Sequence, residues 1–440
     1  MKELSIYTIS LGCPKNLVDT EKILGSLDKY YSPAQDLEHA DMVLINTCSF
    51  IQPAVEESIQ NILDISRDME NLQNRPKLVV TGCLVARYGS ELEKELPEVD
   101  LWVDLNEQED FVDKFARKFD LGIDPEMEPE DTSSRTNRVL STFPGYSYLK
   151  ISEGCPHNCN FCLIPQLRGK LQSEAIHDLR QEAENLLSGG VKELCLVAQD
   201  VTSYGRDLGL KDGLQQLLRE MIELEGLSWL RLMYLYPVGI TSGLLSFLTT
   251  LGPKFKPYFD IPLQHAHPDI LKSMGRPFAQ DPEKVITRIR SYFPEASIRT
   301  TFIVGYPGET EEHFQTLLDF VRDARFDHVG VFSFYPEQGT RAAQMQDQVS
   351  EEVKEDRRKE LLQEQASISE EKMASYVDTW QEVLIDKKDP EWPTLYQGRT
   401  WFQAPEIDGI TYVSAHDCQP GDMVWAKIEE SKIYDLIALV

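Results

Sequence analysis

The sequence has no apolar run approaching the roughly 20 consecutive residues that a membrane-spanning helix needs. This absence argues against a protein that crosses a bilayer. The first residues, MKELSIYTISLGC, also lack the basic-then-apolar order of a secretory signal and instead alternate like a short strand. We therefore expect a cytoplasmic protein. Its eight cysteines should then be reduced thiols, because disulfides are rare in that compartment.

Basic residues are scarce relative to acidic ones. The chain has 44 Lys and Arg against 73 Asp and Glu, which gives a formal net charge of −29. Because neutralisation of phosphates supplies most non-specific nucleic-acid affinity, a general nucleic-acid-binding protein is not expected, whereas a strongly basic protein would be a favourable partner. At 41% hydrophobic residues the chain can still bury sizeable cores, which excludes an intrinsically disordered protein.

Internal repeats and low-complexity tracts are also absent, and 440 residues suggest about three domains. In residues 1–120, strand patterns rich in β-branched residues alternate with helical ones, which predicts an open parallel α/β sheet. Residues 121–140 are polar, proline-containing and aperiodic, which is typical of a linker.

The remaining chain changes character once more. Within residues 141–370, six strand patterns are each followed by a helix-length stretch, which predicts a (β/α)6 partial barrel with its chemistry at the carboxyl ends of the strands. A charged helix, exposed along one side, is expected after the last of these strands. Residues 371–440 contain short strands separated by Gly, Pro and Asp turns, which predicts a small antiparallel β-barrel.

Three cysteines occur together in GCPHNCNFC, directly after the first predicted barrel strand: Cys155, Cys159 and Cys162. Structural zinc commonly takes four ligands, and this loop offers only three. A [4Fe–4S] cluster is also held by four cysteines, so three would leave one iron open to a small molecule. We favour the cluster, with a zinc site or plain thiols as the alternatives.

A second trio is dispersed along the chain. Cys13, Cys48 and Cys83 follow the strand patterns LSIYTISLG, ADMVLINT and KLVVTG. In a parallel sheet the carboxyl ends of the strands share one edge, so these thiols can converge although 35 residues separate successive members. The alternative is three independent buried cysteines. Cys195 and Cys418 are interpreted as a core residue and a turn residue.

These features resemble a known family. The C-x-x-x-C-x-x-C spacing after the first barrel strand resembles the signature of radical S-adenosylmethionine (SAM) enzymes. With a three-cysteine α/β module in front and a small barrel of the TRAM type behind, essentially the whole chain resembles the methylthiotransferases of that superfamily. The segments SLGCPKNLVDTE, NTCSFIQPAVEESI and YFDIPLQHAHPDILKSMGRP are similar to the RimO-type branch, which modifies a ribosomal protein.

The resemblance implies addition of a methylthio group to the β-carbon of an aspartate on the twelfth small-subunit ribosomal protein. It also implies two [4Fe–4S] clusters, S-adenosylmethionine, and an electron donor such as a flavodoxin-type reductant. The contiguous trio would hold the cluster that cleaves S-adenosylmethionine to a radical, and the dispersed trio a cluster that presents sulfur. No catalytic residues beyond the cluster ligands are expected.

Three other functions remain open alongside this one. They are a MiaB-like methylthiotransferase acting on a tRNA adenosine, a non-catalytic iron–sulfur scaffold or electron carrier, and a zinc-binding interaction protein. Residues 371–440 carry 6 Lys and Arg against 13 Asp and Glu, a net charge of −7. This charge favours a protein substrate over tRNA phosphates.

The ends of the barrel strands supply candidates for cofactor binding, namely Gln199, Asp200, Gln264, His265, Gly305, Gly308 and Tyr335. Following the family pattern, Gln199 would accept a hydrogen bond from the amino group of the methionine part, but capping of the next helix is an alternative for Gln199 and Asp200. Gln264 and His265 would contact cofactor or substrate, or else form a satisfied buried pair. Gly305 and Gly308 would let the backbone approach the adenosine, or would simply form a turn.

Arginines and tryptophans give weaker signals. Arg276 is expected to pack or to lie at the surface. The family often has further arginines after Arg168, and here they are missing, so contacts attributed to those arginines are in doubt. Arg168 is expected to be exposed, with a role as the one remaining arginine of this set as the alternative. Among the tail tryptophans, which are Trp380, Trp392, Trp401 and Trp425, exposed rings would mark a substrate-docking face.

Overall fold

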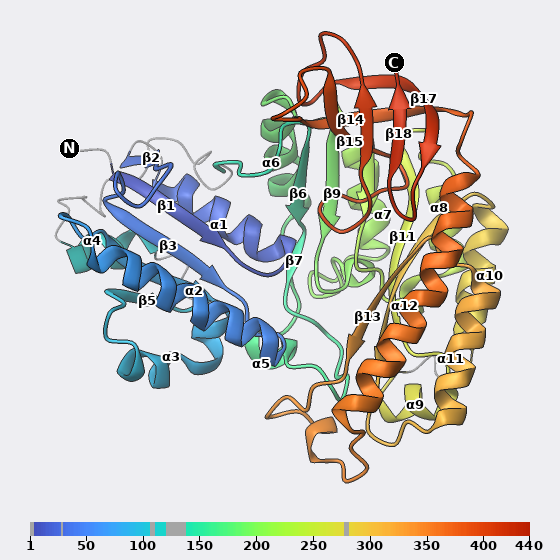
Figure 1. Ribbon diagram of the computed structural model, residues 1–440, viewed down its shortest axis with the longest axis horizontal. Coiled ribbons are helices and arrows are strands. Elements are labelled where there is room, and N and C mark those ends of the chain that lie inside the picture. Colours follow the sequence, from blue (N-terminus) through green and yellow to red (C-terminus); the bar gives the residue numbers. More distant parts are fainter. Residues whose placement is uncertain (1–3, 28–29, 106–110, 120–137, 277–280) are drawn as a thin grey trace. The chain divides into compact units, whose positions relative to one another are not determined.

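The computed structural model describes residues 4–27, 30–105, 111–119, 138–276 and 281–440. They form two compact units, which Figure 1 traces in chain order. The first comprises Met1–Ser141 and Leu163–Lys170, and the second comprises Thr142–Cys162 and Leu171–Val440. Residues 121–137 of the predicted linker lie outside the described residues.

The first unit contains a five-stranded sheet in the order β2-β1-β3-β4-β5, and all four strand pairings are parallel. Its strands are β1 (Leu4–Ser10), β2 (Tyr31–Pro33), β3 (Met42–Thr47), β4 (Lys77–Gly82) and β5 (Leu101–Val103). Its helices are α1 (Pro14–Leu27), α2 (Gln52–Glu70), α3 (Cys83–Glu95), α4 (Phe111–Phe119) and α5 (Ile164–Leu167). The parallel α/β sheet expected from the sequence is confirmed.

Helices cover both faces of this sheet, and the sequence of β3 shows why. Every residue of β3 is buried. Val43 and Ile45 pack in one apolar cluster with residues of α2 and α3, whereas Met42 and Leu44 pack in another with residues of α1 and α4. A parallel strand between two helical layers must be apolar on both sides. The carboxyl ends of the strands therefore remain as the edge at which polar and reactive side chains can gather.

The second unit begins with six parallel strands in the order β13-β12-β11-β10-β9-β6. They are β6 (Tyr146–Lys150), β9 (Glu193–Val197), β10 (Trp229–Leu232), β11 (Phe255–Gln264), β12 (Ser297–Val304) and β13 (His328–Ser333). The intervening helices are α6 (Ile176–Ser188), α7 (Gly213–Ile222), α8 (Ser242–Leu248), α9 (Pro268–Ser273), α10 (Pro282–Tyr292) and α11 (Glu311–Ala324). The first strand, β6, and the last, β13, lie at the two edges of the sheet and do not pair with each other, so the barrel is open. The predicted partial barrel is confirmed.

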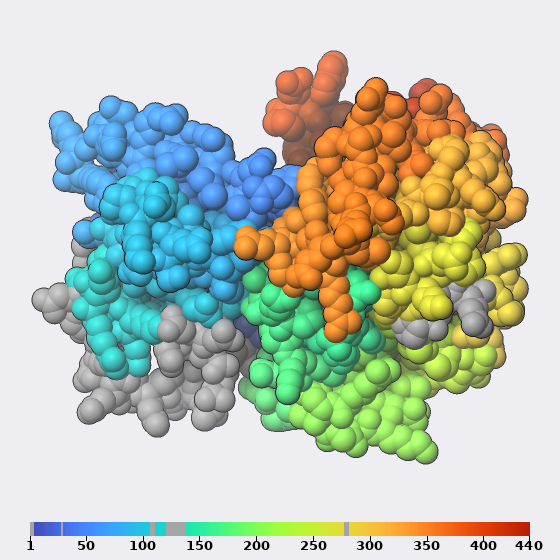
Figure 2. All heavy atoms as spheres, turned by 90° about the horizontal axis from the view of Figure 1, so that it is seen from below, coloured from blue at the N-terminus to red at the C-terminus, as the bar shows by residue number. Residues whose placement is uncertain are grey.

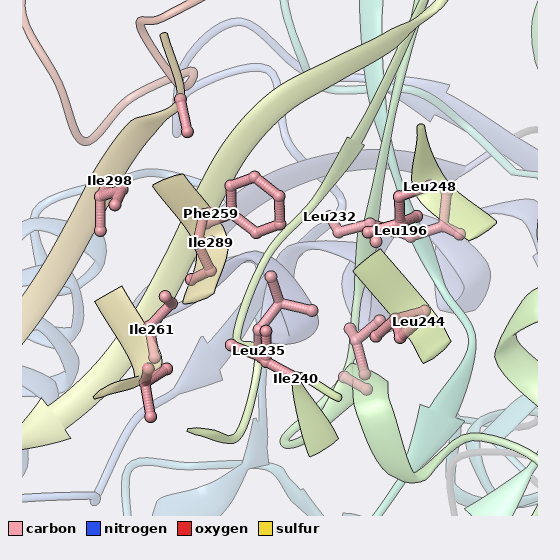
Figure 3. Close-up of a cluster of buried hydrophobic side chains, with 14 of the residues drawn as sticks. Leu196, Leu232, Leu235, Ile240, Leu244, Leu248, Phe259, Ile261, Ile289 and Ile298 are labelled. Atoms are coloured by element: carbon pink, nitrogen blue, oxygen red, sulfur yellow. The ribbon is translucent and has the colours of Figure 1, made fainter. Parts of the chain in front are cut away.

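The outer face of the partial barrel carries the main apolar core. Figure 3 shows Leu196 of β9 and Leu232 of β10 on the side of Leu244 and Leu248 of α8, with Phe259 of β11 nearby. Residues that alternate with these along the strands point to the inner face, and there the sequence is more polar. Burial of the outer face against helices thus leaves the inner face for charged and aromatic groups.

The tail forms a closed barrel in the order β14-β15-β16-β18-β17. Its strands are β14 (Trp380–Lys388), β15 (Leu395–Thr400), β16 (Thr411–Ser414), β17 (Met423–Ser431) and β18 (Leu436–Leu439). The predicted small antiparallel barrel is confirmed, with one parallel pairing, which joins β18 to β16. This follows from the order, in which the chain turns back through β17 and returns beside β16 in the same direction.

A long helix, α12 (Glu351–Ala374), connects the partial barrel to the tail barrel. Its buried side chains recur every three or four residues, including Lys354, Arg357, Leu361 and Gln365. The predicted one-sided exposure of this charged helix is confirmed. Among the helices of the described ranges, none is both long and apolar enough to cross a membrane.

Three of the four tail tryptophans are exposed. The side chains of Trp380, Trp392 and Trp425 have exposed fractions of 58–64%. Trp401 is instead half-buried and packs against the apolar core of the tail barrel. The register of β14 and β17 pairs Trp380 with Lys427 and Glu382 with Trp425, so the rings of Trp380 and Trp425 are diagonal neighbours on one outer face.

The tail barrel is joined to the partial barrel by a buried ion network. At the amino end of β9, Glu193 Oε1 accepts from Arg231 Nε at 2.7 Å, and Glu193 Oε2 accepts from Arg399 Nη1 at 2.6 Å. Arg399 of β15 also donates to Asp386 of β14 at 2.8 and 2.9 Å. The carbonyl of Trp401 accepts from Arg231 at 2.9 Å. Charged groups of both barrels thus neutralise one another away from water.

The loop after β15 extends this network along the amino ends of the other strands. Glu406 accepts hydrogen bonds from Tyr146 and Tyr148 of β6, each at 3.1 Å. Asp408 accepts from Tyr258 of β11 at 2.6 Å and from Arg299 of β12 at 2.7 Å. The tail therefore covers the amino end of the six-stranded sheet, and the carboxyl ends, where the cysteine loop begins, lie at the other end of the strands.

We predict that Glu193→Gln destabilises the protein. Burial favours the neutral carboxyl, but the charges of Arg231 and Arg399 outweigh burial and hold the pKa of Glu193 below its usual value. Loss of this carboxylate leaves two buried guanidinium groups undercompensated, which should lower the free energy of unfolding by about 3–5 kcal/mol in denaturant titrations.

The pH dependence and a surface control sharpen this test. Because the folded-state pKa of Glu193 is depressed, its stabilisation is present above the usual carboxyl pKa of about 4.3 and is lost as the pH falls further. The difference between wild type and variant should therefore shrink in acid. Arg180→Gln, which removes an exposed pair with Glu220, should change nothing measurable. Equal stability of Glu193→Gln and wild type at neutral pH would contradict the role of the network.

Candidate metal and cofactor sites

The structure brings Cys13, Cys48 and Cys83 together at the carboxyl edge of the first sheet. Cys13 immediately precedes α1, Cys48 follows β3, and Cys83 is the first residue of α3. The three thiols are close enough to influence one another electrostatically, since Cys13 and Cys83 both raise the pKa of Cys48. The structure thus brings these three distant positions together, and their binding of a shared metal centre stays a prediction.

The amide of Asn16 holds the segments that carry this trio. Its Nδ2 atom donates to the carbonyls of Leu11 and Thr47, each at 2.9 Å, and these residues lie just before Cys13 and Cys48. Its Oδ1 atom lies 3.9 Å from Cys83 Sγ. Asn16 is fully buried, so these contacts are not exchanged for water. One side chain thus ties three strand ends to each other.

The three thiols differ in their tendency to ionise. Burial raises the pKa of Cys13, but the charges of Lys15 and Arg168 and the N–H groups of α1 outweigh burial and lower it overall. Burial raises the pKa of Cys48 to about 11 and also raises that of Cys83. Since metal ligation requires thiolates, binding at this site would release protons.

Arg168 does not lie where the sequence suggested. The expected exposed position is wrong, because its side chain is only 2% exposed and donates to Asp19 Oδ2 at 3.2 Å and to Asn16 Oδ1. The reason is that Leu163–Lys170 belongs to the first unit, where α5 contacts α3. A single arginine in a polar segment carries no sequence signal for such burial.

We predict that Gly12→Ala disturbs this trio. A Cβ atom at Gly12 would lie 2.7 Å from Cys48 Cβ and 3.0 Å from Cys48 Sγ, and Gly12 has a φ of +91°. The variant should therefore displace Cys48 and reduce the iron that the trio retains after anaerobic reconstitution. Gly209→Ala is the matched control, since Gly209 has a φ of +68° but open space around its Cβ position. Equal iron contents in the two variants would contradict the prediction.

The second trio lies on the loop that follows β7 (Ser152–Glu153), at the carboxyl end of the partial barrel. Asn160 fixes the middle of this loop, because its Nδ2 atom donates to the Ser273 carbonyl at 2.7 Å and its N–H donates to the Met274 carbonyl at 3.0 Å. The carbonyl of Asn160 accepts from the N–H of Ala342 at 2.9 Å. The loop is thus anchored to the regions after β11 and after β13.

The start of the cysteine loop is anchored through His157. Its Nε2 atom lies 2.7 Å from Asp200 Oδ2, and its ring stacks on Tyr236 with a centroid separation of 3.6 Å. Asp200 also accepts from Thr202, Ser203 and the N–H of Tyr236. Burial raises the pKa of Asp200, but the hydrogen bonds from His157, Ser203 and Thr202 outweigh it and lower it overall.

These contacts bear on the expectation that Asp200 binds a cofactor. Its carboxylate oxygens already accept several hydrogen bonds, and one of them caps the short helix at Val201–Ser203. Asp200 therefore positions the cysteine loop. Cys155, the first cysteine of that loop, has its pKa raised to about 11 by burial. Like Cys48, it is a protonated thiol at neutral pH until a metal displaces the proton.

Two glutamines keep buried oxygen atoms for a ligand. Gln199 Nε2 donates to Glu153 Oε1 at 3.1 Å, but Gln199 Oε1 has no hydrogen-bond partner among the described residues. The same holds for Gln264 Oε1 and for Ser152 Oγ. Gln264 also has a φ of +74°, which is strained for a residue other than glycine. Buried acceptors of this kind fit the amino group of a bound amino acid.

Other predicted contacts have structural partners in place. His265 is fully buried, accepts from the N–H of His267 at 2.9 Å through Nδ1, and lies 3.3 Å from Glu309 Oε2 through Nε2. At Gly305 a Cβ atom would lie 2.2 Å from Lys354 Cγ, so the packing of α12 already requires glycine there. The Nε2 atom of His265 and the Oε2 atom of Glu309 have no hydrogen-bond partner among the described residues, so contact of His265 with cofactor or substrate stays a prediction.

The remaining candidates are distributed around the same end of the barrel. Gly308 has a φ of +81° and open space around its Cβ position, and its N–H donates to the Asp347 carbonyl at 2.7 Å. Tyr335 is half-buried just after β13. Arg276 is buried, with its guanidinium 4.9 Å from the ring centroid of Tyr236 and 5.7 Å from that of Phe161. Cys195 is buried in β9, and Cys418 is buried in a turn of the tail barrel.

The structure also places one other group of possible metal ligands together. Among the described residues, His267, Asp269 and His313 place three ligand atoms within 4.8 Å of one another. Both histidines already accept a backbone N–H through Nδ1 at the start of a helix. Each cysteine trio offers three thiols, and cysteine thiolates are the ligands that hold iron–sulfur clusters.

Sequence reasoning did not identify Asn16, His157, Asn160 or Tyr236 as functional residues. Each acts by holding a cysteine-bearing segment through the backbone or through another side chain. The asparagines and the histidine lie in the quoted motifs CPKN and CPHNCN, so their position beside cysteines was the one available signal. Tyr236 lies far from any cysteine in sequence and gave none.

Comparisons with known proteins agree in all three regions of the chain. Residues 5–104 match the model of the uncharacterized protein family UPF0004, residues 149–321 match the radical SAM superfamily, and residues 379–440 match the TRAM domain. These matches follow one another in the order of the observed sheets.

Full-length relatives carry one name. The chain is 52% identical to "Ribosomal protein uS12 methylthiotransferase RimO" of Oleidesulfovibrio alaskensis over 99% of this chain and 100% of that protein. It is 43% identical to the protein of the same name from Geobacter sulfurreducens over 98% and 97% of the two chains.

Among solved structures, the radical SAM methyltransferase TsrM from Kitasatospora setae, with cobalamin and a [4Fe–4S] cluster bound, matches with a TM-score of 0.55. The two chains are 14% identical, and the match covers 78% of this chain and 74% of that one. At this identity the comparison shows a shared fold.

Proposed function

Since this chain belongs to the RimO family of radical SAM methylthiotransferases, we propose that it adds a methylthio group to the β-carbon of an aspartate on ribosomal protein uS12. Family membership makes it an enzyme that uses S-adenosylmethionine and iron–sulfur chemistry. We further propose that it holds two [4Fe–4S] clusters, one on Cys155, Cys159 and Cys162 and the other on Cys13, Cys48 and Cys83.

The observation that carries this proposal is the convergence of Cys13, Cys48 and Cys83 around the amide of Asn16. Three thiols leave one iron of a four-iron cluster without a protein ligand. Such an open position is what a sulfur-transferring site requires, whereas a closed four-cysteine site would serve structure or electron transfer. Structural zinc usually takes four ligands, so a trio of thiols supports a cluster over zinc.

The residues at the carboxyl end of the partial barrel fit S-adenosylmethionine. The buried Oε1 atoms of Gln199 and Gln264 would accept hydrogen bonds from its amino group, and the backbone at Gly308 would approach its adenosine. His157 and Asn160 would keep the cysteine loop in place while the ligand binds. When bound, the cluster and S-adenosylmethionine together supply a radical able to remove hydrogen from an unactivated carbon.

The surface charge supports a basic protein as substrate. Residues 371–440 have a net charge of −7, and Trp380 and Trp425 are exposed on one outer face of this tail, beside Glu382 and Lys427. Exposed tryptophans on a tail of net negative charge suit a small basic protein better than a phosphate backbone. The action on a ribosomal protein would take place in the cytoplasm, with a flavodoxin-type protein as a fitting electron donor.

Two clusters predict separable losses of iron. In anaerobically reconstituted protein, Cys13→Ala should lose about four irons and keep the rest, and Cys155→Ala should lose a different set of about four. Cys418→Ala is the control, because Cys418 lies in a turn of the tail barrel and should retain all iron. Iron and sulfide assays measure the result. Full iron in Cys13→Ala would exclude the second cluster.

Substrate identity is tested directly by mass spectrometry. The reduced enzyme with S-adenosylmethionine and a sulfide source should add the mass of one methylthio group to an aspartate of uS12. Unmodified tRNA in the same mixture should remain unchanged, because the acidic tail offers little to neutralise phosphates. Methylthiolated tRNA with unmodified uS12 would instead establish the MiaB-like activity.

A further inference from the structure

We propose that Arg168 is a positioning and charge-compensating residue of the site formed by Cys13, Cys48 and Cys83, and that its cation raises the reduction potential of the cluster held there. This inference rests on the proposed function, because it takes that trio to hold an iron–sulfur cluster. It assigns a role to a residue that is not a ligand.

The guanidinium of Arg168 is held in a fixed place. Its side chain is 2% exposed, and it donates to Asn16 Oδ1 and, at 3.2 Å, to Asp19 Oδ2. The same Oδ1 atom of Asn16 lies 3.9 Å from Cys83 Sγ. The cation is therefore one hydrogen-bonding group away from a ligand of the cluster, and its orientation is set by two partners.

The guanidinium of Arg168 is close to the whole trio. It lies near enough to Cys13, Cys48 and Cys83 to interact electrostatically with each sulfur, and it forms a side-chain hydrogen bond with Cys83. Its cation therefore faces all three proposed ligands although it is also paired with Asp19.

A buried cation beside a cluster has a defined electrostatic consequence. Three thiolates bring negative charge into a partly buried site, and such charge is stabilised by a compensating cation. Reduction adds one more electron to the same site, so a neighbouring cation stabilises the reduced form more than the oxidised form. Loss of that cation should make the cluster harder to reduce.

Arg168 lies close in sequence to the contiguous cysteine trio, although its contacts are with the dispersed one. It is the sixth residue after Cys162, the last ligand of the contiguous trio, yet Leu163–Lys170 belongs to the first unit. A short segment thus continues from a ligand of one proposed cluster to the counter-charge of the other.

The test uses the full-length chain with Cys155, Cys159 and Cys162 replaced by alanine, so that only the dispersed trio can be loaded. In this parent, Arg168→Met and Arg168→Lys are compared with Arg67→Met, which changes an exposed arginine of α2 paired with Asp64. Iron and sulfide are assayed after reconstitution, and the midpoint potential is determined by a redox titration followed by electron paramagnetic resonance.

We expect the midpoint potential to shift in the negative direction in Arg168→Met, to shift less in Arg168→Lys, and not to shift in Arg67→Met. An unchanged midpoint in Arg168→Met, with iron at the level of the parent, would overturn the inference and leave the proposed function intact. Absence of iron from the parent itself would overturn the second cluster, and the role of Arg168 with it.

Folding of each variant is checked by circular dichroism. If Arg168→Met does not fold, Arg168→Gln takes its place, because glutamine can still donate a hydrogen bond toward Asn16 but carries no charge. If the midpoint potential of Arg168→Gln equals that of Arg168→Lys, the result counts against the inference. If the midpoint potential of Arg168→Gln is more negative than that of Arg168→Lys, the result supports it.

Discussion

The dispersed cysteine site depends on one buried amide. Asn16 donates two hydrogen bonds to the ends of the segments that carry Cys13 and Cys48, and it accepts one from Arg168 beside Cys83. Only an amide side chain can donate twice and accept in the same plane. An aspartate at position 16 has the same size, but its ionised carboxylate has no proton to donate to the carbonyls of Leu11 and Thr47. The convergence of the three strand ends is thus fixed by a residue that would bind no metal itself.

A second constraint operates at the opposite end of the partial barrel. The polar inner face of that sheet could not remain buried without partners, and the tail supplies them through Arg399, Glu406 and Asp408. Since the amino ends of the strands are covered in this way, the carboxyl ends are left for the cysteine loop and for Gln199 and Gln264, whose Oε1 atoms have no hydrogen-bond partner among the described residues. The arrangement explains how a small tail barrel can stabilise a catalytic unit at a distance from the chemistry.

Much of this organisation could be predicted because it follows from local rules. Strand patterns ending in Cys13, Cys48 and Cys83 indicate one sheet edge as soon as the sheet is known to be parallel. The roles of single polar residues could not be predicted in the same way. Asp200 and Gly305 both stand at strand ends, as cofactor-binding residues do, but one caps a helix and anchors His157, and the other accommodates Lys354.

The sequence by itself determined the order of the sheets, the six candidate thiols and the acidic character of the tail, because periodicity, spacing and charge are properties of the chain alone. Only the tertiary structure decided that Arg168 lies buried beside one trio and that β18 pairs parallel with β16. Burial and partner choice depend on which distant segments meet. That information is absent from any short window of the chain.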